Sequence, residues 1–330
     1  MAPYHRWVRT MAKGKTESGA GTGKDDILRD WLKGLGPRSM PGVMSFYGVP
    51  FEQEVAGADA VALGLPFDLG TSNRPGARFG PRSMREASVY YSTGEITRPD
   101  FFSRHRIVDA GDVRFYTGDL EHAMMVIEAE TWRILQQGPK IIALGGDHTV
   151  SLPLLRAHAR RHGNGLALIH FDSHTDTYDL YPKSFHGSPF AEAENEGLID
   201  PLKVVHLGIR TDMGKLESTK GHTMLGADWM LENGMKETIK EIRKVIGRKK
   251  AYLTFDIDFL DPAYAPGTGT PVIGGPSTAQ ARQILRGLSG LNIIGGDVVE
   301  VAPVYDGPGQ ITSLAGAALA YYILELMLEK

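Results

Sequence analysis

The sequence predicts an α/β fold in which a mainly parallel sheet is covered by helices on both faces. Short apolar runs alternate with longer segments of helical periodicity from about Pro50 to the end of the chain. No internal repeat or low-complexity linker interrupts this alternation. Glycine is frequent, with 40 of 330 residues, and is not repetitive, as expected of tight turns and close backbone approaches around a site.

The individual strands and helices follow from the spacing of apolar residues. Apolar runs predict strands at 58–65, 106–109, 140–144, 166–171, 204–209, 252–255 and 292–301. Helical spacing predicts helices at 81–92, 120–137, 151–162, 235–246, 277–288 and 311–328. Regular alternation of strands and helices is typical of a parallel sheet, and sites in such sheets lie beyond the carboxyl ends of the strands.

The chain is expected to consist of an N-terminal extension, residues 1–49, and one large domain, residues 50–330. The extension is basic, has no acidic residue before Glu17, and lacks the continuous apolar core of a secretory signal. A cytoplasmic location is therefore expected, and import into an organelle is the alternative. The apolar segment 313–324 is shorter than the roughly twenty residues of a membrane span, so a core helix is expected there.

Charge and cysteine content exclude several classes of function. Lys and Arg number 36 against 39 Asp and Glu, a net charge of −3, which argues against nucleic acid as the main partner. Cysteine is absent, so the chain can form no disulfide, thiol nucleophile or zinc–thiolate site. Any bound metal must therefore be held by His, Asp and Glu.

Potential metal ligands come directly after three of the predicted strands. After strand 166–171, two carboxylates and an imidazole stand at alternate positions, so their side chains can point to the same side. Two aspartates follow strand 252–255 with the same spacing, and a histidine follows strand 140–144 after two glycines. Unpaired charge is costly to bury there, and a metal removes that cost. The candidate ligands are His148, Asp172, His174, Asp176, Asp256 and Asp258.

The charge of this set indicates two metal ions. Its four aspartates carry four negative charges, which two divalent cations balance. Oxygen-rich sites with some imidazole suit Mn²⁺, and Ni²⁺ or another late first-row ion is the alternative.

Two further residues carry charge without an obvious structural purpose. His186 lies in a short loop after the metal motif and can exchange protons near the metals, or it is an ordinary surface residue. Glu300 follows a buried apolar run and can hold a planar cation through two hydrogen bonds, or it pairs with a neighbouring arginine. We assign no chemical role to Asp297 in the same run.

In these segments the chain resembles the ureohydrolases, the arginase/agmatinase family of binuclear metal enzymes. The resembling segments are 64–86, 145–157, 169–179, 186–190, 253–275 and 297–306. The resemblance implies a single-domain, three-layer α/β/α sandwich with a central eight-stranded parallel sheet. It also implies two Mn²⁺ ions, hydrolysis of a small guanidino substrate to urea and an amine, and a homo-oligomer of three or six subunits.

The same resemblance implies a role for each site residue. One ion would be bound by His148, Asp172, Asp176 and Asp256, and the other by Asp172, His174, Asp256 and Asp258, so that two of these aspartates bridge. A bridging water, activated by the ions, would attack the guanidinium carbon. Glu300 would bind the guanidinium, Asp176 would accept the proton of the attacking hydroxide, and His186 would relay a proton to the leaving amine.

The substrate is less closely determined. The loop 177–186 lacks the Asn and Ser pattern of arginases, whereas segments 265–275 and 298–306 are most similar to agmatinases. In that loop, Asp179 would favour the free amine of agmatine, and Lys183 would favour a carboxylate such as that of 4-guanidinobutanoate. The alternatives are 3-guanidinopropanoate, guanidine, a biguanide, or a role as one subunit of a hetero-oligomeric ureohydrolase. Ser173 stands where alanine is usual, which can alter a hydrogen bond to a ligand.

A metallophosphoesterase also uses Asp and His clusters with two metals. Such enzymes resemble one another in several histidines late in the chain, whereas the last histidine here is His222. The sequence therefore disfavours that class.

Overall fold

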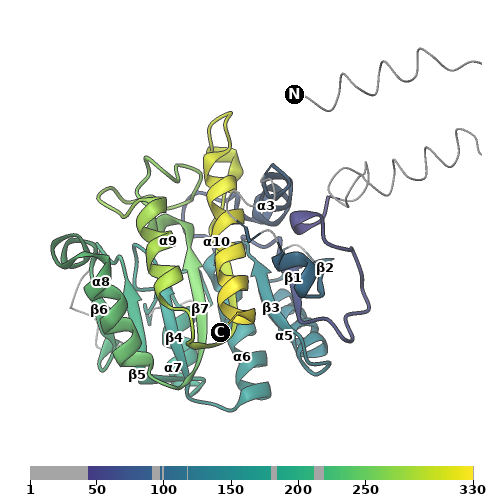
Figure 1. Ribbon diagram of the computed structural model, residues 1–330, viewed down its shortest axis with the longest axis horizontal. Coiled ribbons are helices and arrows are strands. Elements are labelled where there is room, and N and C mark those ends of the chain that lie inside the picture. Colours follow the sequence, from purple (N-terminus) through teal and green to yellow (C-terminus); the bar gives the residue numbers. More distant parts are fainter. Residues whose placement is uncertain are drawn as a thin grey trace, which may run out of the picture. The chain divides into compact units, whose positions relative to one another are not determined.

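The computed structural model describes residues 44–90, 97–98, 100–116, 118–179, 184–211 and 219–329. They are built around one eight-stranded sheet with the strand order β2-β1-β3-β8-β7-β4-β5-β6 (Figure 1). Every pair of neighbouring strands in this sheet is parallel. The predicted α/β class and the eight-stranded parallel sheet are confirmed.

The strands lie where apolar runs predicted them, apart from one short strand at the sheet edge. Their bounds are β1 Ala60–Gly64, β2 Ile107–Asp112, β3 Lys140–Leu144, β4 Leu166–Phe171, β5 Ile199–Leu207, β6 Thr223–Leu225, β7 Lys250–Asp256 and β8 Asn292–Val299. Strand β6 was not predicted, because it has three residues and no apolar run. Strands β1 and β4 are buried along their whole length, as expected of strands covered on both faces.

Helices follow most of the strands. Their bounds are α3 Gly80–Ser88, α4 Phe101–Arg104, α5 Leu120–Leu135, α6 Ser151–His162, α7 Pro189–Asn195, α8 Ala227–Ile246, α9 Thr278–Gly287 and α10 Ile311–Leu328. The short helices α4 and α7 were not predicted. Helix α8 begins at Ala227, ahead of the predicted position 235. Gly234, which has a φ of 76°, interrupts the helical pattern, so the predicted helix started only after it. Helix α9 begins at a capping box between Ser277 and Gln280.

The sheet separates two apolar cores, which gives three layers. Val61 and Leu63 of β1 pack in one core with side chains from α5, α6 and α7. Ala60 and Ala62 of the same strand point the other way, into a core shared with α3, α8, α9 and α10. Figure 1 shows α9 and α10 crossing the sheet on this second side. The core includes Phe46, which lies ahead of the predicted start of the ordered part near Pro50.

Helix α10 is long and apolar enough to cross a membrane by length and composition, with a mean hydropathy of 1.6. Within the fold, however, 78% of this segment is buried. It therefore fits the core helix that the sequence predicted.

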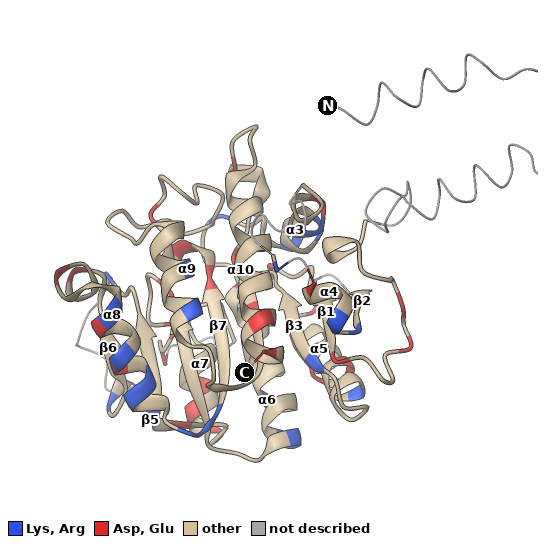
Figure 2. Ribbon diagram, viewed as in Figure 1, with Lys and Arg blue, Asp and Glu red and all other residues tan. Residues whose placement is uncertain are grey.

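Surface charges of both signs are interspersed, as the near-neutral net charge implies. Helix α8 carries acidic and basic side chains along its length (Figure 2). They include the ion pairs Glu237–Lys240 and Glu241–Lys244. Charges of opposite sign therefore lie next to one another on this helix.

Candidate metal centre

The six candidate ligands come from the carboxyl ends of three strands, β3, β4 and β7. Strands β3, β8, β7 and β4 are adjacent in the sheet, so the segments that follow them lie side by side. His148 opens the 3₁₀ helix η4, His148–Val150, directly after the β3 turn. The ligands of the DSHTD segment follow β4, Asp256 ends β7, and Asp258 lies in the 3₁₀ helix η6, Ile257–Phe259.

Two groups of ligand atoms share one carboxylate. Atoms of His148, His170, Asp172 and Asp176 lie within 4.8 Å of one another. Atoms of Asp172, His174 and Asp258 form a second group and also lie within 4.8 Å of one another. Because Asp172 belongs to both groups, the geometry suits two ions that are bridged by one carboxylate.

The hydrogen bonds of His148 leave its second ring nitrogen free to bind a metal. The Thr254 hydroxyl donates to Asp297 Oδ1 over 2.5 Å. Its oxygen lies 2.8 Å from His148 Nε2. A hydroxyl has one proton, so Thr254 must accept from the Nε2–H of His148. The lone pair of a neutral His148 is therefore on Nδ1.

His148 Nδ1 faces a ring of carboxylates. It lies 2.8 Å from Asp176 Oδ2, 3.1 Å from Asp172 Oδ2 and 3.3 Å from Asp256 Oδ2. Despite these short distances, His148 Nδ1 has no hydrogen-bond partner among the described residues. Burial lowers the pKa of His148, but the three carboxylates outweigh it and hold the pKa well above its usual value. The pocket thus attracts positive charge to the position of Nδ1, which fits a divalent ion.

The second ligand group also attracts positive charge. His174 Nδ1 lies 3.1 Å from Asp258 Oδ2 and 3.5 Å from Asp172 Oδ1. Burial lowers the pKa of His174, yet these carboxylates raise it to about 12. Burial and the neighbouring aspartates raise the pKa of Asp258, and that of Asp256 well above its usual value. Two divalent ions would relieve this repulsion.

Ser173 supports Asp258 from the position where alanine is usual in the resembling family. Its backbone N–H donates to Asp258 Oδ1 over 3.0 Å, and its hydroxyl donates to the same oxygen over 2.8 Å. The hydroxyl of Ser173 therefore gives the proposed ligand Asp258 a second hydrogen-bond donor, in addition to the backbone N–H.

His186 and Glu300 lie together beside the ligands. His186 Nδ1 is 3.0 Å from Glu300 Oε1, which also accepts from the backbone N–H of His148 over 3.0 Å. On its other side, His186 Nε2 lies 2.7 Å from the Ser72 hydroxyl. Burial lowers the pKa of His186, but Glu300, Asp176 and other acids outweigh it and raise the pKa to about 9. Its side chain is 11% exposed, so it is not an ordinary surface histidine.

Glu300 is held in a strained backbone conformation at the end of β8. It has a φ of 61°, and Asp176 has a φ of 51°, values that cost a residue with a side chain about 1–2 kcal/mol. Such strain persists where the surroundings fix it, and it concentrates at functional sites. Glu300 is 1% exposed, and among the described residues its ion-pair partner is His186 rather than an arginine.

Several buried polar residues of the site were not assigned a role from the sequence. Asp297 accepts from Ser151, Tyr252 and Thr254, so it orients His148 through Thr254. Asp147 accepts from the backbone N–H groups of Gly70 and Thr149, and burial together with Glu300 raises its pKa to about 7. His170 contacts Asp172. In the sequence, only their positions next to candidate site residues, in the motifs GGDH, IHFD and DVVE, indicated that these three residues belong to the site.

The two residues predicted to select the substrate are not both described. Asp179 is exposed, unlike the buried carboxylates of the ligand groups. Lys183 lies outside the described residues.

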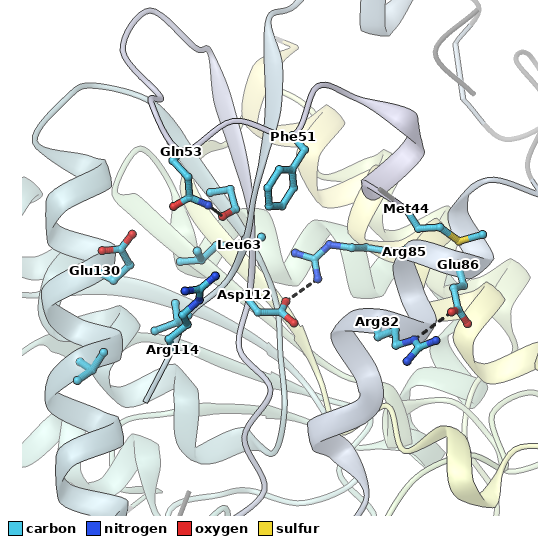
Figure 3. A pocket seen from close by; sticks show the side chains of 14 residues that line it. Met44, Phe51, Gln53, Leu63, Arg82, Arg85, Glu86, Asp112, Arg114 and Glu130 are labelled. Atoms are coloured by element: carbon cyan, nitrogen blue, oxygen red, sulfur yellow. Dashed lines mark hydrogen bonds and ion pairs between the residues drawn. The ribbon is translucent and has the colours of Figure 1, made fainter. Parts of the chain in front are cut away.

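A separate cavity of about 910 Å³ lies at the other end of the sheet order, along β2 (Figure 3). Arg85 pairs there with Asp109 and Asp112, and Arg82 pairs with Glu86. None of the six candidate ligands lines this cavity. This cavity is therefore separate from the His/Asp cluster.

Comparisons with known proteins point to one family. The sequence profile described as the Arginase family matches residues 58–325. Agmatinase from Neisseria meningitidis serogroup A is 48% identical over 281 residues, which are 84% of this chain and 89% of that protein. A crystal structure of a hypothetical agmatinase from Burkholderia thailandensis is 44% identical, with a TM-score of 0.82 over 87% of this chain and 91% of that one. Proclavaminate amidino hydrolase from Streptomyces clavuligerus is 36% identical, with a TM-score of 0.83 over 89% and 99%.

Proposed function

This chain belongs to the arginase family, and we propose that it hydrolyses agmatine to putrescine and urea. Membership of the family makes it a hydrolase of carbon–nitrogen bonds in guanidino compounds, as the sequence predicted. The observation that carries the proposal is the buried cluster in which Asp172 is shared by two groups of ligand atoms. Similarity to agmatinases over most of the chain supports the choice of agmatine.

We propose that the cluster holds two Mn²⁺ ions. His148, Asp172, Asp176 and Asp256 would bind one ion, and Asp172, His174, Asp256 and Asp258 the other. Carboxylate oxygens with two imidazoles suit Mn²⁺, and Ni²⁺ is the closest alternative. When bound, two such ions supply a water whose pKa is lowered enough to serve as a nucleophile near neutral pH.

Glu300 is proposed to orient the guanidinium group. Its buried carboxylate lies next to the ligands, and a planar cation can bind such a group through paired hydrogen bonds. A Cβ atom at Gly269 would come within 3.6 Å of Glu300 Oε2, so the glycine leaves space beside this oxygen. Fixing the guanidinium carbon in front of the nucleophile lowers the entropic part of the barrier.

His186 and Asp176 are proposed to move protons. The carboxylate of Asp176 lies within the first ligand group and would accept the proton of the nucleophile. The neighbouring acids raise the pKa of His186 to about 9, which favours its proton-donating form near neutral pH, and this form would donate to the leaving amine. Ser72 and Glu300 contact its two ring nitrogens, which fixes the plane of the ring.

The substrate proposal is tested by urea release from a panel of guanidino compounds. Purified protein loaded with Mn²⁺ should have its highest kcat/KM with agmatine, above arginine, 4-guanidinobutanoate, 3-guanidinopropanoate, guanidine and biguanides. A higher value for another member of the panel would refute agmatine and leave the hydrolysis standing. Activity of the chain by itself would also exclude the need for a different partner subunit.

We further propose that the chain forms a homo-oligomer of three or six subunits in the cytoplasm. A groove between α9 and α10 is lined by apolar side chains that include Tyr264 and Ile311, which are 44% and 45% exposed. An apolar surface of this kind is typical of subunit contacts. Light scattering on the eluted protein measures the subunit number, and cell fractionation measures the location.

A further inference from the structure

An unbroken row of hydrogen bonds leads from the shared carboxylate to the surface. Asp172 Oδ2 lies 2.8 Å from His170 Nε2, and His170 Nδ1 lies 2.7 Å from His206 Nδ1. His206 Nε2 lies 2.9 Å from His222 Nδ1, and His222 Nε2 lies 3.0 Å from Glu194 Oε2. We call these five residues the histidine chain.

The fold places the histidine chain across the edge of the sheet. His170 on β4 and His206 on β5 are partners in the parallel register. His222 directly precedes β6, and Glu194 lies on α7. The side chains of all three histidines are buried, whereas that of Glu194 is 29% exposed. Only the outer end of the histidine chain therefore meets solvent.

The number of protons restricts how the histidine chain can be bonded. Its four hydrogen bonds need four protons, and three neutral imidazoles provide three of them. Both ends are carboxylates, which only accept when ionised. The histidine chain must therefore carry one additional proton, on an imidazole or on Glu194.

The surroundings favour the outer end for this proton. Burial lowers the pKa of His206 well below its usual value and that of His222 to about 4. Burial raises the pKa of Glu194. A positive charge on any of the three buried imidazoles would have to be desolvated, whereas a proton on Glu194 leaves all three imidazoles neutral. With the proton on Glu194, every bond of the histidine chain donates toward Asp172.

We propose that the histidine chain is a positioning device for the metal centre, in which Glu194 acts as the terminal donor that fixes the direction of the bonds. It holds His170 as the Nε2–H tautomer, which donates to Asp172 and sets the orientation of its carboxylate. Hydrogen-bond partners of this kind orient ligands, and their loss lowers metal affinity by about 10–100-fold. The proposal rests on the two-metal centre proposed above.

The test compares two substitutions of the terminal residue. Glu194→Gln keeps a donor, because its amide can donate to His222 Nε2, whereas Glu194→Ala removes it. Glu196→Ala is the matched control, since Glu196 follows α7 and pairs with Arg156 outside the histidine chain. Metal-free protein is titrated with Mn²⁺ by calorimetry, and thermal unfolding of the metal-free forms reports any damage to the fold.

We expect Glu194→Ala to weaken binding of at least one ion by about tenfold, the lower end of the range for such partners. Glu194→Gln and Glu196→Ala should bind Mn²⁺ like the parent. Parental affinity in Glu194→Ala would overturn the positioning role, and equal weakening in Glu194→Gln would overturn the role of Glu194 as a donor. Failure of the parent to bind two ions would instead refute the proposed metal centre.

A spectroscopic measurement tests the direction of the bonds without any substitution. In protein loaded with diamagnetic Zn²⁺, nitrogen NMR of labelled histidines should show His170 protonated at Nε2, and His206 and His222 protonated at Nδ1. Protonation of His206 and His222 at Nε2 alone would reverse the direction and overturn the proposal. This result does not depend on catalytic activity.

Discussion

Replacing Thr254 by valine removes the hydroxyl that joins His148 to Asp297 and keeps a side chain of nearly the same shape. The parent hydroxyl lies 2.8 Å from His148 Nε2 and 2.5 Å from Asp297 Oδ1, and all three side chains are buried. In Thr254→Val the Nε2–H of His148 loses its acceptor. A buried donor without a partner costs about 1–3 kcal/mol, so the free energy of unfolding should fall by this amount.

The same substitution should weaken metal binding, because nothing then fixes His148 with its lone pair on Nδ1. Loss of a hydrogen-bond partner that orients a ligand lowers affinity by about 10–100-fold. Each factor of ten corresponds to about 1.4 kcal/mol of binding free energy. Thr254→Ser retains the hydroxyl and serves as the control.

Calorimetric titration of metal-free protein with Mn²⁺ measures this effect directly. Thr254→Val should show a larger dissociation constant for the ion at His148, and Thr254→Ser one close to that of the parent. An unchanged dissociation constant in Thr254→Val would refute the reasoning that assigns the tautomer of His148 through Thr254 and Asp297.

Four further predictions concern turnover, its pH dependence, a ligand and selectivity. His186→Ala should keep both metals and lower kcat by about 10²–10⁴-fold, and unchanged turnover would exclude a proton relay. Since the pKa of His186 is raised to about 9, its proton-donating form is present below that pH, so kcat of the parent should fall as the pH rises through about 9. Ser173→Ala should weaken Mn²⁺ binding by less than about tenfold, because the backbone N–H still donates to Asp258, and calorimetry would show otherwise if the hydroxyl were essential. Lys183→Ala should change kcat/KM for agmatine by less than about tenfold and Asp179→Asn should lower it, whereas the reverse pattern would favour an acidic substrate.

The convergence of the proposed ligands could be predicted because each of them lies at or just after the end of a strand. Apolar runs identify β4 and β7, and the aspartates that follow them alternate with residues of other kinds. A parallel sheet then brings these strand ends to one edge. Local patterns were sufficient to predict that Asp172 and Asp256 lie close together, because the strands that precede them are visible in the sequence.

Other parts of the site depend on contacts that no local pattern contains. The partners of Asp297 come from α6 and β7, so its position in an apolar run suggested nothing about its role. The contact of His170 with His206 arises from the register between β4 and β5, which pairs residues 36 positions apart. Such long-range hydrogen bonds become visible only when the strands are assembled.

The fold shows the same distinction. Helix α8 could be predicted only after Gly234, because this residue breaks the helical geometry within the element. Strand β6 has three residues at the edge of the sheet and is defined by its pairing with β5 rather than by composition. Short elements of this kind are specified by their neighbours in space.

The most direct test of the two-metal hydrolase is urea release from agmatine, measured while Mn²⁺ is added stepwise to chelator-treated protein. Elemental analysis of each sample gives the number of ions bound per chain. Two ligand groups that share Asp172 predict negligible activity without metal and a maximum at two ions per chain. Full urea release from protein that contains no metal would contradict the account.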